Sequence, residues 1–171
     1  SVVAMLAEKY GPRLCVVDSS NEIAGDGDTP HRLLKSARRL QVADPEQLAA
    51  KLIEALINHG PAVMIVDELA RPSEVKNIIR IIQRGVRVIA CLHGDTIQEV
   101  VRNPDYEPLL GIDNGQHIYP TILTSAVELR ERGFYYAYET LSNAVDDVLF
   151  NNIPASKLLP LENLTTLKQN L

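Results

Sequence analysis

Three short apolar runs, each followed at once by polar or acidic side chains, constrain the fold of this chain more than any other feature. They are RLCVVD (13–18), PAVMIVDE (61–68) and VRVIACLHGD (86–95). Their length and β-branched content predict buried strands. Two segments of helical period lie between them, DPEQLAAKLIEALINHG (44–60) and RPSEVKNIIRIIQRG (71–85). Strands that alternate with helices predict an α/β fold, a parallel sheet with helices on both faces.

The remaining segments give weaker patterns. Residues 2–9 predict the end of a helix, HRLLKSARRL (31–40) a short basic helix, and TIQEVVRN (96–103) a short helix closed by Pro104. HIYPTILTSAVELRERG (117–133) is typical of one more strand and helix, and FYYAYETLSNAVDDVLF (134–150) predicts a helix. We find no internal repeat.

Composition excludes several classes of protein. A formal charge of −5 and an isoelectric point near 5.4 argue against a broad electrostatic surface for nucleic acid. Both cysteines, Cys15 and Cys91, lie inside apolar runs, which indicates reduced packing residues and not a disulfide framework. The apolar runs are far shorter than the roughly 20 residues of a membrane span, so we expect a soluble chain.

The three predicted strands end in side chains that can do chemistry. In a parallel sheet these ends share one edge, so Asp18, Glu22, Asp67, Glu68 and His93 should converge there. AVMIVDE has the Walker B form, in which Asp67 would hold Mg²⁺ through water and Glu68 would polarise an attacking water. His93 could sense a terminal phosphate.

Each of these residues also has a simpler interpretation. Asp67 and Glu68 could be an exposed acidic pair at a strand end, and His93 a surface residue. Glu22 could belong to a solvated turn or to a weak cation site. Arg38 and Arg39 are candidates for phosphate contacts, also across a subunit interface as arginine fingers, although a solvated basic helix face would contain the same residues.

Together, RLCVVDSSNEIAGDGDTPH, ARRLQV, LIEALINHGPAVMIVDE, RGVRVIACLHGDTIQEVVRNP and LLGI resemble the P-loop ATPase family of stage III sporulation protein AA and its plastid and cyanobacterial relatives. The resemblance runs from about residue 13 to residue 112. It implies a RecA-like or AAA-type ATPase fold, with ATP and Mg²⁺ as cofactors. Glu22 resembles the acidic-box glutamate of secretion ATPases, and His93 resembles their histidine-box residue.

The resemblance also implies partners and a location. Such ATPases form rings or filaments, so we expect a homo-oligomer. Relatives often carry a domain for single-stranded nucleic acid, which here would lie outside this chain. The expected location is the cytoplasm of a bacterium or a plastid.

One departure from the family is large. The phosphate-binding motif G-x-x-x-x-G-K-[ST], called Walker A, occurs nowhere in the 171 residues. We therefore expect a fragment that starts just after this motif and lacks the first strand and the P-loop, which would leave a strand edge exposed. Residues 1–125 would be the truncated ATPase core and residues 126–171 a helical C-terminal extension. Alone, this chain should bind ATP weakly or not at all.

Three functions remain open. The leading hypothesis is the body of an ATP-binding and ATP-hydrolysing P-loop ATPase whose Walker A lies outside this chain. The alternative is a degenerate, non-hydrolysing module that keeps the fold to bind a partner or nucleic acid. A Mg²⁺-dependent receiver-like or phosphatase-like domain is a third option, because Asp18 and Asp67 lie on two of the predicted strands.

Overall fold

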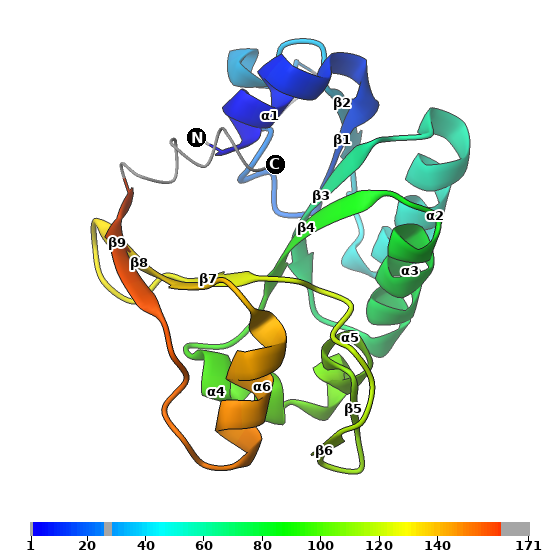
Figure 1. Cartoon of the computed structure of the whole chain (residues 1–171). Coiled ribbons are helices and arrows are strands. Elements are labelled where there is room, and N and C mark those ends of the chain that lie inside the picture. Colours follow the sequence, from blue (N-terminus) through cyan, green and yellow to red (C-terminus); the bar gives the residue numbers. More distant parts are fainter. Residues whose placement is uncertain (1, 26–28, 162–171) are drawn as a thin grey trace. The chain divides into compact units, whose positions relative to one another are not determined.

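A computed structural model describes residues 2–25 and 29–161 of the chain. The chain divides into two compact units, Ser1–Leu92 and His93–Leu171. Figure 1 shows their helices and strands. In the described residues, no helix is long and apolar enough to cross a membrane.

The first unit is built on a four-stranded sheet in the order β2-β1-β3-β4, and every neighbouring pair is parallel. The strands are β1 (Leu14–Asp18), β2 (Arg38–Gln41), β3 (Val63–Leu69) and β4 (Arg87–Leu92). All five residues of β1 are buried, as are six of the seven in β3, whereas β2 and β4 are partly exposed edge strands. This arrangement confirms the predicted α/β class.

Three helices pack against this sheet: α1 (Val2–Tyr10), α2 (Leu48–His59) and α3 (Pro72–Gln83). Leu6 and Ala7 of α1 form a core with Val16 and Ile65 on one face of the sheet. Alternate strand residues point to the opposite face, which α2 and α3 cover (Figure 1). Helices therefore flank both faces, as predicted.

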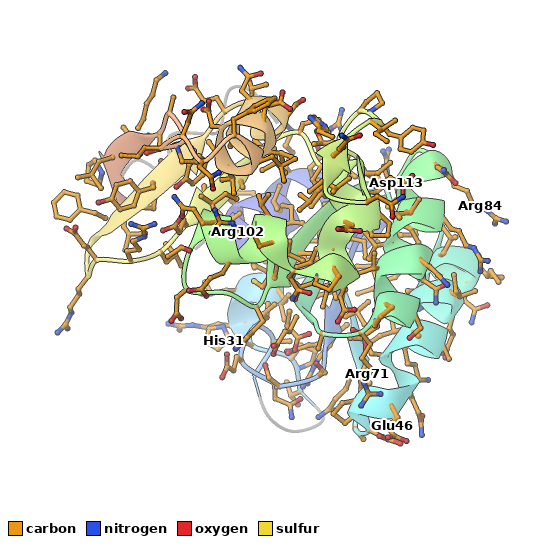
Figure 2. All side chains as sticks on the ribbon, turned by 90° about the horizontal axis from the view of Figure 1, so that it is seen from below. His31, Glu46, Arg71, Arg84, Arg102 and Asp113 are labelled. Atoms are coloured by element: carbon orange, nitrogen blue, oxygen red, sulfur yellow. The ribbon has the colours of Figure 1, made fainter. Side chains whose placement is uncertain are left out.

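Local signals explain where these helices begin and end. Asp44 accepts a hydrogen bond from the N–H of Glu46 and caps a 3₁₀ turn, η3 (Pro45–Gln47), that leads into α2. Gly60, with φ of 50°, ends that helix in the left-handed conformation. Arg71, the residue before α3, forms an ion pair with Glu46 of η3, with 3.9 Å between the charged atoms. Both residues are labelled in Figure 2.

The short basic helix predicted for residues 31–40 is wrong. The segment forms a 3₁₀ turn, η2 (Arg32–Leu34), followed by β2. Because β2 is an edge strand, only Leu40 among its four residues is buried, and an apolar run was not needed to form it. A further 3₁₀ turn, η1 (Gly11–Arg13), connects α1 to β1.

The second unit combines short helices with two small antiparallel sheets, β5-β6 and β7-β8-β9. Its helical elements are α4 (Ile97–Arg102), η4 (Pro104–Tyr106), α5 (Glu107–Leu110) and α6 (Leu141–Leu149). Its strands are β5 (Ile112–Asp113), β6 (Gln116–His117), β7 (Ala126–Glu128), β8 (Phe134–Tyr138) and β9 (Lys157–Pro160). The predicted short helix before Pro104 is confirmed as α4, which Thr96 caps.

The structure differs from the expectation for residues 117–150. In 117–133 a strand, β7, forms as expected, but the expected helix does not. In 134–150 β8 occupies the first part of the segment expected to be one helix, and α6 the second part. The sequence FYYAY has the aromatic content that favours a strand, and the antiparallel neighbours β7 and β9 supply its pairing. The functional division at residue 125 stays a prediction.

A buried carboxylate connects elements of the second unit. Glu128 accepts hydrogen bonds from the N–H of Ile97 (2.9 Å) and the hydroxyl of Tyr138 (2.9 Å), and it pairs with Arg130. Burial, together with the adjacent Glu128 carboxylate, raises the pKa of Tyr138 to about 12. These bonds join β7 and β8 to the start of α4.

Candidate functional site

Asp67 lies at the centre of the carboxyl edge of the sheet in the first unit. One of its oxygens, Oδ2, accepts the N–H groups of Ser19 (2.6 Å) and Ser20 (2.7 Å). The other, Oδ1, accepts the N–H of Glu68 (2.9 Å), and the Ser19 hydroxyl lies within 3.0 Å of both. Asp67 therefore ties β3 to the segment that follows β1; we call these contacts the Asp67 clasp.

The clasp decides the charge of this carboxylate. Burial alone would raise the pKa of Asp67, whose exposed fraction is 8%. The donors of Ser20, Ser19 and Glu68 outweigh burial and lower the pKa instead. Asp67 is therefore an ionised carboxylate at neutral pH.

Asp18, the last residue of β1, is a second carboxyl group at this edge. Its side chain is fully buried, with Oδ2 accepting the N–H of Ala24 at 2.7 Å and Oδ1 without a hydrogen-bond partner among the described residues. Burial, and then the negative charge of Asp67, raise the pKa of Asp18, although the Ala24 bond opposes the shift. The two aspartates thus have opposite shifts, one held ionised and one held toward its neutral form.

The loop after β1 is held by side chains of β2. The Arg39 guanidinium donates to Asn21 Oδ1 (2.9 Å) and to the carbonyl oxygen of Gly25, and Gln41 donates to the same Asn21 oxygen at 2.7 Å. Asn21 has a φ of 63°, a left-handed conformation that asparagine tolerates better than most residues. Arg39 therefore lies at the carboxyl edge, where it positions this loop.

Two further carboxylates, Glu22 and Glu68, are exposed near this edge. Glu68 directly follows Asp67, and Glu22 lies two residues after Ser20, whose N–H donates to Asp67. Burial, and then the charges of Asp67, Glu68 and Glu22, raise the pKa of the Cys91 thiol on β4. The structure therefore brings Glu22, Asp67 and Glu68 into one acidic region. Cys91 is a free, protonated thiol beside that region.

Arg38 and His93 were also predicted at this site. Arg38 pairs with Cys15 near the start of β1, and its guanidinium donates to the carbonyl oxygen of Pro12 (3.2 Å) and contacts His59 Nδ1 (2.8 Å). It therefore lies at the amino edge of the sheet, away from the acidic region. His93 follows the last residue of β4 and belongs to the second unit, where its N–H donates to the Tyr106 hydroxyl at 3.2 Å.

The described residues of the acidic region do not by themselves form a site for Mg²⁺ and a triphosphate. A carboxylate offers about four lone-pair positions, and the clasp occupies those of Asp67. Within 2–25 and 29–161, no group of three or more histidine, cysteine, aspartate or glutamate side chains could hold a metal ion. The 171 residues also lack the glycine-rich motif whose amides cradle phosphates. Among the carboxylates of this region that the structure describes, Glu22 and Glu68 are exposed.

Sequence reasoning missed the roles of Ser19, Ser20 and Asn21. The pattern D-S-S-N after a buried strand did contain a signal, because serine and asparagine often bond to backbone and side-chain groups in turns. It could not reveal that both serines donate to a carboxylate 47 or 48 residues further along the chain. Only the pairing of β1 with β3 brings these groups together.

Comparisons with known proteins agree with part of the predicted kinship. The chain is similar to the uncharacterized protein ycf45 of Porphyra purpurea, with 31% identity over 171 residues that cover 90% of this chain and 30% of that protein. It is 35% identical to protein SEEDLING PLASTID DEVELOPMENT 1 of Arabidopsis thaliana over 179 residues, covering 94% of this chain and 25% of that protein.

A more distant similarity is found to stage III sporulation protein AA of Bacillus subtilis, with 32% identity over 107 residues, 61% of this chain and 33% of that protein. No family model matches the chain. The chain spans about a third or less of the length of these three relatives. The similarity to the sporulation protein and to the plastid proteins is thus confirmed, and the link to P-loop ATPases stays a prediction.

Proposed function

We propose that the first unit is the body of a nucleotide-binding, ATPase-like domain of the P-loop type that works within a longer protein. The observation that carries the proposal is the acidic region, where Glu22, Asp67 and Glu68 gather at the carboxyl edge of a parallel sheet. Ligands of open α/β sheets bind at this edge. The similarity to stage III sporulation protein AA supports it.

The geometry favours different tasks for the three carboxylates. Glu68 and Glu22 are exposed, and in this proposal they would orient or deprotonate a water molecule, as general bases do. Asp67, predicted as the metal ligand, is engaged in the clasp, so its assigned task is to position the loop that carries Glu22. In the intact protein, ATP and Mg²⁺ would be held mainly by a phosphate-binding segment outside these 171 residues.

His93 and the two arginines take distinct places in this proposal. His93, immediately after β4, stays the candidate for sensing a terminal phosphate. Arg39 positions the loop after β1, and Arg38 would contact phosphate only in a neighbouring copy, as an arginine finger. Such a contribution requires a homo-oligomer.

A further domain and a cellular location are also part of the proposal. The curated relatives are several times longer than this chain, which leaves room for a separate domain that binds single-stranded nucleic acid. The name of the Arabidopsis relative refers to plastid development. It supports the proposal of a plastid location. For a bacterial protein, the cytoplasm is the alternative proposal.

A degenerate module that binds a partner without hydrolysing ATP is the second candidate. The clasp favours it, because a saturated Asp67 stabilises the fold without any metal. The missing glycine-rich motif favours it as well.

The test compares the full-length protein with its Glu68→Gln variant. Calorimetry should show binding of Mg²⁺-ATP by both proteins, and hydrolysis should fall by roughly 10²- to 10⁴-fold in the variant, the usual contribution of a general base. Glu54→Gln, which removes only a surface ion pair with Lys51 on α2, is the matched control and should hydrolyse at the normal rate. Equal turnover by all three proteins excludes Glu68 from the mechanism, and failure of the full-length protein to bind ATP supports the degenerate module.

A further inference from the structure

The amino edge of the same sheet, opposite the acidic region, contains a cavity of about 450 Å³. It is lined by Tyr10 at the end of α1, by Arg13 before β1, by Arg87 at the start of β4, and by residues 60–62 and Gly85. All of these belong to the first unit. A cavity of this size is of the scale that binds small molecules.

The backbone fixes the spacing of the two arginines. The N–H of Ala62 donates to the carbonyl oxygen of Arg13 (2.9 Å), and the N–H of Arg87 donates to that of Ala62 (3.1 Å). Arg13 and Arg87 therefore lie on either side of Ala62, just before the start of β3. Their backbones are two strand spacings apart, or about 10 Å. Long arginine side chains at this separation can converge on one ligand between them.

The charges of the cavity are of one sign. Arg87 donates to the Tyr10 hydroxyl at 2.8 Å, a neutral partner. In the part of the chain that the structure describes, no carboxylate forms an ion pair with Arg13 or Arg87, and no acidic residue lines the cavity. Arg38 lies at the same edge, held by Pro12. Positive charge is thus concentrated here in a chain whose formal charge is −5.

We infer that this cavity is a binding site for a small phosphate compound with two or more phosphate groups, recognised by Arg13, Arg87 and the Tyr10 hydroxyl. Guanidinium groups bind phosphate oxygens in pairs of parallel hydrogen bonds. Open backbone at Gly60 and Gly85, where a Cβ would meet nothing within 4 Å, leaves space for the ligand. A nucleic acid is less well matched, because Tyr10 alone offers a ring on which a base could stack.

This site is independent of the proposed function, since the two lie at opposite ends of the strands. The experiment is a calorimetric titration of the chain with inorganic pyrophosphate, without Mg²⁺ and at low salt. Wild type should bind saturably. The double variant Arg13→Gln and Arg87→Gln should bind roughly 10- to 100-fold more weakly, as expected for the loss of hydrogen bonds between charged groups.

The matched control is the double variant Lys76→Gln and Arg80→Gln, which removes the same charge from the exposed face of α3. Its affinity should stay within about twofold of wild type, because only long-range attraction is lost. An equal loss in both double variants, or no saturable binding by wild type, overturns the inference. Tighter binding of an oligo-dT strand through the same two arginines would overturn the assignment to a small molecule.

Folding of each variant is checked by circular dichroism. If the glutamine pair does not fold, the pair Arg13→Lys and Arg87→Lys replaces it, because lysine keeps the charge and loses the forked donor geometry. Pyrophosphate affinity should then fall by several-fold, and an unchanged affinity would overturn recognition by guanidinium pairs.

Discussion

The Asp67 clasp predicts a measurable part of the stability of the first unit. In Asp67→Asn the amide oxygen can still face the N–H groups of Ser19 and Ser20, but the NH₂ group then faces the N–H of Glu68, leaving that donor unpaired. An unpaired buried donor costs about 1–3 kcal/mol, and each bond that loses its charged acceptor weakens by about 1 kcal/mol. Partial exposure of Ser19 and Ser20 reduces the sum. We expect the free energy of unfolding to fall by about 2–4 kcal/mol.

Urea unfolding at pH 7, followed by circular dichroism, measures this loss. Glu22→Gln makes the same chemical change on an exposed side chain of the same edge and should cost no more than about 0.5 kcal/mol. Because the folded-state pKa of Asp67 is lowered, its stabilisation is complete above the unfolded pKa of about 4 and is lost as pH falls through the folded value. A loss at pH 7 equal to that of Glu22→Gln would show that the clasp does not stabilise the fold.

Three other variants test the raised pKa of Asp18 and the close backbone approach at Gly111. Asp18→Asn keeps an acceptor for the N–H of Ala24 but cannot ionise. Because folding raises the pKa of Asp18, wild type loses stability relative to this variant as pH rises from the unfolded pKa through the folded one. Urea unfolding at pH 4.5 and pH 8 should therefore show that the free energy of unfolding of the variant increases relative to that of wild type. A constant difference would contradict the shift. Gly111 and Gly115 share a φ of 72°, but a Cβ would clash with the Tyr119 carbonyl only at Gly111. Thermal unfolding should therefore show a loss of stability of about 1 kcal/mol for Gly115→Ala and about 3 kcal/mol for Gly111→Ala. Equal costs would refute the close approach.

The central strands could be predicted because burial dictates their composition. Residues 14–18 and 63–67 are covered on both faces, so apolar side chains fill both alternations and the run is visible in the sequence. In the edge strand β2 only Leu40 is buried. Its two arginines are as compatible with an exposed helix as with an edge strand. Long-range pairing with β1 selects the strand, and no local pattern contains that information.

The candidate site could be predicted only in part: its position at the sheet edge could, but its hydrogen bonds could not. The placement of Asp67 and Glu68 beside the start of the loop that carries Glu22 follows from parallel strands that end at one edge. The hydrogen bonds of Asp67 do not follow from topology, because they depend on the path of the loop after β1. The loop, in turn, depends on Asn21 and on Arg39 from another strand.

Arg38 and Arg39 show why adjacent residues of one motif can serve opposite ends of a sheet. Arg38 stands beside the second residue of β1, so its side chain reaches Pro12 and His59 at the amino edge. Arg39, one residue further along, reaches forward to Asn21 and the loop at the carboxyl edge. A strand of four residues is about 13 Å long, comparable to the reach of two extended arginine side chains. The pair is therefore better described as two separate structural contacts than as one phosphate-binding element, and a variant of each arginine alone should disturb a different edge of the sheet.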